Sequence, residues 1–159
     1  MDKLIIRALD PDVDWIHFRD AYNWRTQKRL ARMPEGVVSF EDFSNPLPNE
    51  AALGMFNGQL EALFLIQDRG MGLFEVHFTN RQGLEKDLLA AGALTVKNRL
   101  FEQGAREIYG WLREKHARPN HPIRRFAESI GFFLDKQSTN YVIMHGDRWV
   151  WWRRFSAKR

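Results

Sequence analysis

The stretch RPNHPIRRFAESIGFF, residues 118–133, combines the start of a helix, its end and the opening of a strand. His121 and Pro122 suit an N-cap and the first helical position, because the N–H that proline lacks is unpaired there anyway. Gly131 suits the C-terminal cap, where a positive φ is common. The residues therefore predict a short helix that runs into a strand. Asn120, which precedes the helix, either begins a turn or belongs to a ligand site.

Three apolar runs separated by turn residues lie N-terminal to this stretch. Asn57 and Gly58 separate AALGMF from QLEALFLIQ, and an Asp-Arg-Gly triplet separates QLEALFLIQ from MGLFEVHF. Because Asn-Gly between apolar runs is a strong hairpin signal, the runs predict a three-stranded antiparallel meander. The middle run is apolar at both odd and even positions, and we expect it to lie inside the sheet.

Helical periodicity returns after the meander. Apolar residues recur with a helical period from residue 84 to residue 103, and Gly104 follows. Because this helix lies between two strands, the chain needs a parallel strand pair with a right-handed crossover. The other predicted elements are strands at 3–9, 106–114, 132–144 and 148–155, one or two helices with a basic run at 12–33, and a long loop at 34–50.

Composition limits the classes of function. A chain of 159 residues that is 44% hydrophobic fits one domain. Because it has no cysteine, it forms no disulfide and holds no thiolate metal site or cysteine nucleophile. No run approaches the roughly 18 apolar residues that span a membrane, so we expect a cytoplasmic protein without membrane contact. The net charge of +4 favours something anionic, such as a phosphorylated cofactor, an acidic partner or nucleic acid.

The order of elements and the spacing from Asn120 to Gly131 and Phe132 together resemble the GCN5-related N-acetyltransferase (GNAT) superfamily, whose members often have an Asn, a helix and then Gly-Phe. The resemblance covers residues 51–134. It implies that residues 1–159 form a single GNAT-like domain of the α/β (α+β) class. The expected sheet is mixed and mostly antiparallel, with a central splayed parallel strand pair, and helices flank it. The resemblance also implies acetyl-CoA as cosubstrate, bound between the splayed strands.

The resemblance further assigns a pyrophosphate-binding loop to the stretch NRQGLEKDLL. Gly83 matches the family pattern, whereas Glu85 stands where the family has a small residue. A glutamate at a helix N-terminus suits the helix dipole, but it competes there with a phosphate. We therefore expect Arg81 and Lys86 to contribute to cofactor binding together with Gly83.

Glu75 and His77 share one face of the run LFEVHF, because side chains alternate along a strand. The alternation by itself favours an exposed polar face. The resemblance instead implies that a carboxylate on this strand acts as the general base, which makes Glu75 the first candidate and His77 the second. It also implies that backbone amides from Val76 to Phe78 hold the pantetheine and the thioester carbonyl, and that Asn120 contributes to the cofactor site.

Candidates for the general acid are fewer. The family commonly places a tyrosine where this chain has Ala127, and that tyrosine protonates the departing thiolate. The remaining candidates in this sequence are Tyr141 and Tyr109, neither of which lies at the family position. No metal site is expected.

The C-terminal run RWVWWRRFSAKR is rich in tryptophan and arginine. In a strand, Trp149 and Trp151 face one way, and Val150 and Trp152 face the other. Either both faces pack within the domain, or the tryptophans anchor a protein partner or a second copy of the chain, with arginines at the rim. Stacking on single-stranded nucleic acid is a further reading of such a run, but we do not expect a nucleic-acid partner.

Two functions of different classes remain open. The first is an acetyl-CoA-dependent N-acetyltransferase that acts on an amine of a small molecule, or of a protein or peptide. The second is a catalytically inactive GNAT-fold protein that serves as a binding or assembly factor. The degenerate phosphate loop and the small size resemble phage- and prophage-encoded members of this fold, so a phage protein associated with a virion, or active in the host cytoplasm, is included.

Overall fold

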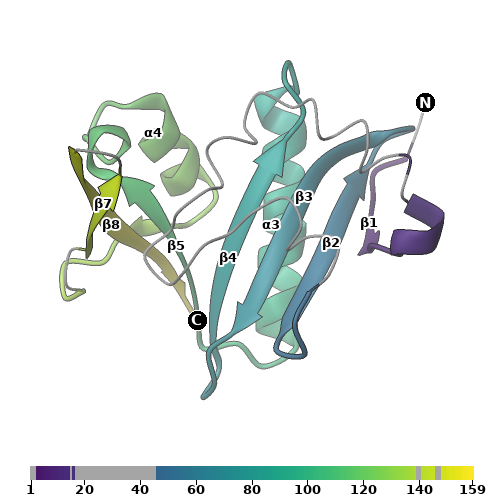
Figure 1. The fold of residues 1–159 in the computed structure, drawn as a ribbon, viewed down its shortest axis with the longest axis horizontal. Helices are drawn as coiled ribbons and strands as arrows, with labels where there is room; N and C mark the ends of the chain where they lie inside the picture. The colour runs from purple at the N-terminus through teal and green to yellow at the C-terminus, as the bar shows by residue number, and fades with distance from the viewer. Residues whose placement is uncertain (1–2, 15, 17–45, 139–140, 146–147) are drawn as a thin grey trace.

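One mixed sheet organises the computed structural model, which describes residues 3–14, 16, 46–138, 141–145 and 148–159 (Figure 1). In these residues the sheet has eight strands. Seven of them follow the order β1-β2-β3-β4-β5-β8-β6, and the eighth, β7, pairs with β8. The strands are β1 (Ile5–Ala8), β2 (Glu50–Phe56), β3 (Leu60–Asp68), β4 (Leu73–Asn80), β5 (Glu107–Arg113), β6 (Phe133–Leu134), β7 (Tyr141–His145) and β8 (Arg148–Lys158). The predicted class, a mostly antiparallel sheet with one parallel pair and flanking helices, is confirmed.

The predicted antiparallel meander is confirmed as β2, β3 and β4. Asn57 N donates to Gln59 O, and Gly58 has a φ of 78°, a conformation that favours glycine. Strand β3 is buried over its first seven residues, because it lies between β2 and β4 and is apolar on both faces. The middle apolar run therefore lies inside the sheet, as its pattern predicts.

Helix α3 (Lys86–Glu102) covers one face of β2, β3 and β4 (Figure 1). Its buried stripe includes Leu89, Val96 and Leu100, which join the hydrophobic core with residues of these strands. Gly92 lies in the same stripe, and a Cβ there would collide with Met55 Sδ. The helix thus approaches the sheet closely at Gly92, which lies against the fully buried Met55.

Strands β4 and β5 form the predicted parallel pair, and they separate soon after they meet. The two strands are paired only from Leu73–Glu107 to Glu75–Tyr109. Beyond these positions β5 continues alongside β8 as far as Arg113, whereas β4 continues alongside β3 as far as Asn80. Figure 1 shows the two ribbons diverging toward their carboxyl ends. The prediction of parallel neighbours that splay apart is confirmed.

A short 3₁₀ helix, η2 (Glu114–His116), and helix α4 (Pro122–Ser129) follow β5. Nδ1 of His121 accepts a hydrogen bond from Ile123 N, so His121 is the N-cap and Pro122 the first helical residue, as predicted. Gly131 ends the helix with a φ of 88°, and Lys97 of α3 donates to the neighbouring Ile130 O. The predicted caps are therefore present, and α3 is tied to the end of α4.

The continuous strand predicted at residues 132–144 is wrong, because the chain forms two strands there. The side chain of Asp135 accepts a hydrogen bond from Gln137 N, and its carbonyl accepts one from Ser138 N, which makes a turn. Strand β6 pairs with β8 at Phe155 and Ser156, whereas β7 pairs with β8 over residues 148–152. The turn separates two short strands that lie along different parts of β8.

Some predictions fall on residues that the structure does not describe. The helices predicted at 12–33 and the loop predicted at 34–50 lie largely outside the described residues. Within the described part of the chain, no helix is long and apolar enough to cross a membrane.

Candidate functional site

Strand β4 has two different faces at the point where it leaves β5. Phe74 and Val76 are partly buried and pack against the core beneath α3. On the opposite face, Glu75 is fully buried and His77 is 3% exposed. The prediction of an exposed polar face, which the alternating pattern favoured, is therefore wrong. A buried carboxylate and a buried imidazole instead lie side by side at the divergence of the two strands.

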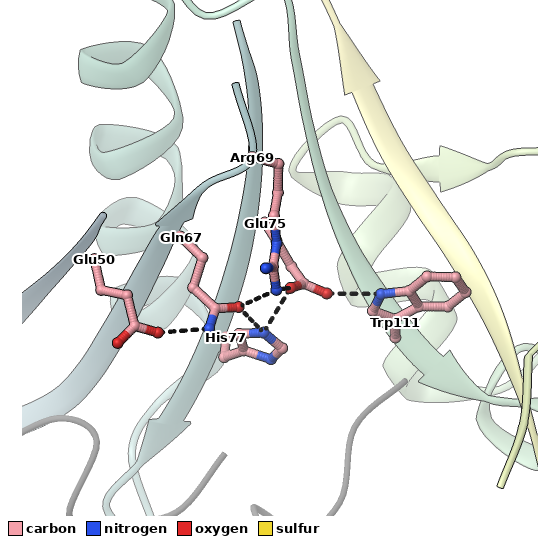
Figure 2. A network of polar contacts seen from close by, with 6 residues as sticks. All are labelled: Glu50, Gln67, Arg69, Glu75, His77 and Trp111. Carbon is pink, nitrogen blue, oxygen red and sulfur yellow. Dashed lines mark hydrogen bonds and ion pairs between the residues drawn. The ribbon is translucent and has the colours of Figure 1, made fainter. Parts of the chain in front are cut away.

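Three donors surround the Glu75 carboxylate (Figure 2). Nη2 of Arg69 donates to Oε2 over 2.5 Å, and Nε1 of Trp111 donates to Oε1 over 2.8 Å. Nε2 of His77 lies 3.3 Å from Oε2. A carboxylate removed from water requires such partners, because an unpaired buried charge is strongly unfavourable. Both oxygens of Glu75 are therefore engaged.

The same neighbours determine the protonation of Glu75. Burial by itself raises the pKa of this carboxyl, but the hydrogen bond and charge of His77 lower it. Arg69 lowers it further in the same two ways, and the net pKa of Glu75 lies below its usual value. Glu75 is therefore a stable anion at neutral pH, because its positive and polar neighbours outweigh the cost of burial.

The contacts of His77 extend across the sheet to β2. Nε2 of His77 lies 2.9 Å from Oε1 of Gln67, and Nη2 of Arg69 donates to the same oxygen over 3.0 Å. Nε2 of Gln67 donates to Oε2 of Glu50 over 2.6 Å. Figure 2 shows this network reaching from Glu50 on β2 through β3 to Glu75 on β4.

Tyr109, one of the two candidate acids, lies beside this network on β5. It is 2% exposed and pairs with Glu75 in the parallel register. The guanidinium carbon of Arg154 lies 3.7 Å from the centre of its ring, and Trp111 meets the ring edge-on at 6.2 Å. Tyr109 is therefore enclosed by an arginine and a tryptophan. Tyr141, the other candidate acid, pairs with Trp152 through β7, and its side chain lies outside the described part.

The predicted phosphate loop lies between β4 and α3. Gly83 has a φ of 83°, and a Cβ there would meet no atom within 4 Å. Arg81 faces back to β3, where its Nε donates to Oε2 of Glu61 over 2.7 Å. Glu85 is the N-cap residue of α3 but makes no capping hydrogen bond with its side chain, and Lys86 is the first helical residue. Glu85, Lys86 and Asp87 are all exposed, so two negative groups and one positive group lie at this helix terminus.

The other predicted cofactor contacts lie on both sides of the divergence. Val76 and Phe78 follow Glu75 on β4, beyond its last pairing with β5. Phe78 is 41% exposed, and its ring lies 6.3 Å from that of Phe126 on α4. Asn120 is exposed in the turn before α4, where His121 N donates to Arg118 O. The turn reading of Asn120 is thus confirmed, and its contact with a cofactor stays a prediction.

The tryptophan-rich strand is buried unequally. Trp152 is 4% exposed and belongs to a small cluster with Tyr109 and Trp111, whereas Trp151 is 47% exposed. The side chains of Trp149 and Val150 lie outside the described residues. One face of β8 at residue 152 therefore packs within the protein, and Trp151 reaches solvent.

Four residues of the network were not among the predicted site residues, namely Glu50, Gln67, Arg69 and Trp111. Gln67 directly follows the continuous apolar stretch at 62–66, and Arg69 belongs to the triplet that was interpreted only as a turn. The sequence signal for Gln67 is a polar residue on a strand that is buried on both faces, where a polar side chain needs a partner.

No protein-family model matches the chain, and no curated protein sequence matches it. Solved structures do match. A probable acetyltransferase of the GNAT family from Chromobacterium violaceum superposes with a TM-score of 0.75 at 14% identity, over 99% of this chain and 88% of that one. Ribosomal-protein-S5-alanine acetyltransferase from Vibrio fischeri has a TM-score of 0.72 at 9% identity, over 99% and 94% of the two chains.

A spermidine N-acetyltransferase chimera from Vibrio cholerae and hSSAT has a TM-score of 0.68 at 17% identity, over 98% of this chain and 95% of that one. At such identities, the agreement concerns the fold. The matches cover nearly the whole chain, including the sheet in which β4 and β5 are the central pair. This chain therefore has the fold of the GCN5-related N-acetyltransferases.

Proposed function

We propose that the protein is an acetyl-CoA-dependent N-acetyltransferase that acts on a primary amine. The observation that carries this proposal is the position of His77 and Glu75. They form a buried imidazole–carboxylate pair on β4. Glu75 is the last residue of β4 that pairs with β5, and His77 lies two residues beyond it. In this fold the divergence leaves β4 unpaired on the side of β5, and polar backbone groups there are available to a bound molecule.

The residues present fit acetyl-CoA. Helix α3 has 17 residues, and its first backbone N–H groups point out of the helix beside a glycine with open space around it. We propose that Gly83 and Lys86 lie against the phosphates, that backbone groups from Val76 to Phe78 hold the pantetheine, and that Asn120 lines the same site. Arg81 anchors the loop through Glu61. When bound, acetyl-CoA supplies an acetyl group activated as a thioester.

We assign the role of general base to His77. Both oxygens of Glu75 are occupied by donors, and its lowered pKa makes it a poor proton acceptor. His77 uses only Nε2 in its contacts with Gln67 and Glu75, and in the described part of the chain no hydrogen bond to Nδ1 is found. Nδ1 accepts the proton of the acceptor ammonium, and Glu75 stabilises the resulting imidazolium. Tyr109 and Tyr141 stay the candidates for the acid.

Several classes of amine are open to test. The similar structures carry names that refer to spermidine, phosphinothricin and the alanine of ribosomal protein S5. The net charge of +4 weakens attraction to a polycation such as spermidine. We therefore propose that a neutral or acidic acceptor, including a peptide N-terminus, is a better substrate for this chain than a polyamine.

A second candidate is a catalytically inactive GNAT-fold protein that binds a partner, for example in a phage virion. Three observations favour it. Glu85 places a negative charge at the helix terminus that a pyrophosphate would occupy, and Ala127 of α4 supplies no acid. Trp151 is half exposed on β8, where it would serve as an anchor for a partner or for a second copy of the chain.

The deciding experiment measures CoA binding by calorimetry and acetyl transfer from radiolabelled acetyl-CoA to a panel of amines. The panel consists of an alanine-terminated peptide, phosphinothricin and spermidine. We expect labelled product from the peptide or from phosphinothricin, and its loss in His77→Gln. Absence of both CoA binding and transfer would favour the inactive binding protein. Its partner would then be sought by co-purification with the wild type and with Trp151→Ala.

A further inference from the structure

We propose that Gln67, oriented by Glu50, is a positioning residue that fixes His77 as the tautomer with its proton on Nε2 and its lone pair on Nδ1. The catalytic consequence of this inference rests on the function proposed above. The assignment of the tautomer rests on the contacts among Glu50, Gln67, Arg69, Glu75 and His77, which hold whether or not the protein is an enzyme.

The orientation of the Gln67 amide is determined from two sides. An ionised carboxylate only accepts hydrogen bonds, and Oε2 of Glu50 lies 2.6 Å from one end of the Gln67 amide, so that end is the NH₂ group. Oε1 of Glu50 already accepts from Leu47 N over 2.9 Å, which holds the carboxylate in place. A guanidinium only donates, and Arg69 lies 3.0 Å from the other end of the amide, so that end is the oxygen. Both neighbours require the same orientation.

The tautomer of His77 follows from this orientation. Nε2 of His77 lies 2.9 Å from Oε1 of Gln67 and 3.3 Å from Oε2 of Glu75. Both of these oxygens are acceptors, so the neutral ring gains hydrogen bonds only when Nε2 carries the proton. The opposite tautomer would place a lone pair against two oxygens in a site where His77 is 3% exposed. The neutral imidazole therefore presents its lone pair at Nδ1.

Glu75 and Gln67 both contact Nε2 of His77, but they affect the ring in different ways. Glu75 supplies a charge that stabilises the protonated ring, but at 3.3 Å it is the more distant acceptor. Gln67 supplies the shorter hydrogen bond without adding a second charge to a buried site. A neutral acceptor fixes the tautomer and leaves the charge balance of Glu75 and Arg69 unchanged. Figure 2 shows Gln67 between Glu50 and His77, in contact with both.

The test is the ¹⁵N NMR spectrum of the imidazole in the free protein at a pH where His77 is neutral, with the signals assigned by their loss in His77→Gln. We expect the Nε2–H tautomer in the wild type. Gln67→Met keeps the length of the side chain but removes the acceptor. It should lower the ratio of Nε2–H to Nδ1–H tautomers by about fivefold, the factor that corresponds to roughly 1 kcal/mol for one neutral hydrogen bond. Glu75 would remain as an acceptor, so we expect a shift and not an inversion.

Two further variants separate positioning from packing. Glu50→Gln allows the Gln67 amide to turn over, and we expect a smaller decrease of the same ratio. The exchanged pair Glu50→Gln with Gln67→Glu again presents a donor at position 50 and an acceptor toward His77, so it should restore the wild-type tautomer. Gln59→Met is the matched control, because Gln59 is an exposed glutamine whose recorded partner is Glu61, away from the ring.

The outcomes are distinct. A wild-type ring protonated on Nδ1, or a ratio unchanged in Gln67→Met, would overturn the inference. Folding of each variant is checked by the dispersion of its amide spectrum, and the less disruptive Glu50→Gln decides the result if Gln67→Met is unfolded. If the tautomer responds as expected while no amine is acetylated, the inference about Gln67 stands and the proposed function fails.

Discussion

Nε1 of Trp111 donates a hydrogen bond of 2.8 Å to Oε1 of Glu75, and this bond joins β5 to β4 on the polar face of the sheet. Trp111 lies two residues beyond Tyr109, the last residue of β5 that pairs with β4. The side chains thus connect the two strands where backbone pairing has ended. Because the divergence defines the proposed cofactor site, this buried bond helps to set how far the strands open.

Trp111→Phe tests the contribution of that bond. The substitution keeps an aromatic ring against Tyr109 but leaves Oε1 of the buried carboxylate without this donor. We expect the free energy of unfolding to fall by about 1–3 kcal/mol, the range for a buried polar group that loses its partner. Urea denaturation measures the change. Trp151→Phe, at a half-exposed position on β8, is the matched control and should change it by no more than about 0.5 kcal/mol. Equal effects of the two substitutions would contradict the proposed role of the bond.

The lowered pKa of Glu75 predicts how stability depends on pH. The pKa of an unfolded glutamate is about 4.3, and that of Glu75 in the folded protein lies below its usual value. The folded state therefore binds the proton less readily, so its extra stability is present above the unfolded pKa and is lost as pH falls through the folded pKa. The difference in unfolding free energy between wild type and Glu75→Gln should shrink as the pH falls below the unfolded value of about 4.3 and through the lower folded pKa.

Urea titrations of both proteins across this range provide the measurement. Glu114→Gln is the control, because Glu114 pairs with Arg153 at the surface and is about half exposed. Its difference from wild type should stay small at every pH. A difference for Glu75→Gln that is constant or grows as the pH falls would show that Arg69 and His77 do not favour the ionised form.

The order of the elements was predictable because it depends on local patterns. The Asn57-Gly58 turn, the apolar stripe of α3 and the caps of α4 are all set by residues close in sequence. The break between β6 and β7 was also marked locally, by an Asp that accepts hydrogen bonds from the residues after it, but the apolar residues on both sides favoured one strand.

The burial of Glu75 and His77 could not be predicted in the same way. Alternation shows that two residues share a face of a strand, but it does not show whether solvent reaches that face. The partners that make burial tolerable are distant in sequence, since Trp111 is 36 positions from Glu75. The same holds for Gln67 and Glu50, which are 17 positions apart and meet only through the pairing of β2 with β3.

His77→Gln tests the proposed base. Glutamine retains a polar side chain on β4 but cannot accept a proton at neutral pH, so kcat with the best acceptor should fall by about 10² to 10⁴. Affinity for acetyl-CoA, measured by calorimetry, should stay nearly unchanged, because the imidazole acts on the acceptor amine. His116→Gln, which alters a histidine next to His121, is the control and should retain wild-type turnover. Undiminished turnover in His77→Gln would assign the base elsewhere.

Glu85→Gln tests where the phosphates of the cofactor lie. Glu85 is exposed at the N-cap of α3, and its side chain makes no capping hydrogen bond, so neutralising it removes a negative charge without removing a recorded cap contact. If the pyrophosphate binds at this helix terminus, CoA should bind roughly two- to fivefold more tightly, as for the loss of one repulsive exposed contact.

Glu102→Gln makes the same charge change at the other end of the same helix, where Glu102 is also exposed, and serves as the control for net charge. Calorimetry at low ionic strength should therefore separate the two variants, and the separation should decrease as salt is added, because screening weakens exposed charge interactions. Equal affinities for CoA in both variants would place the phosphates away from the terminus of α3.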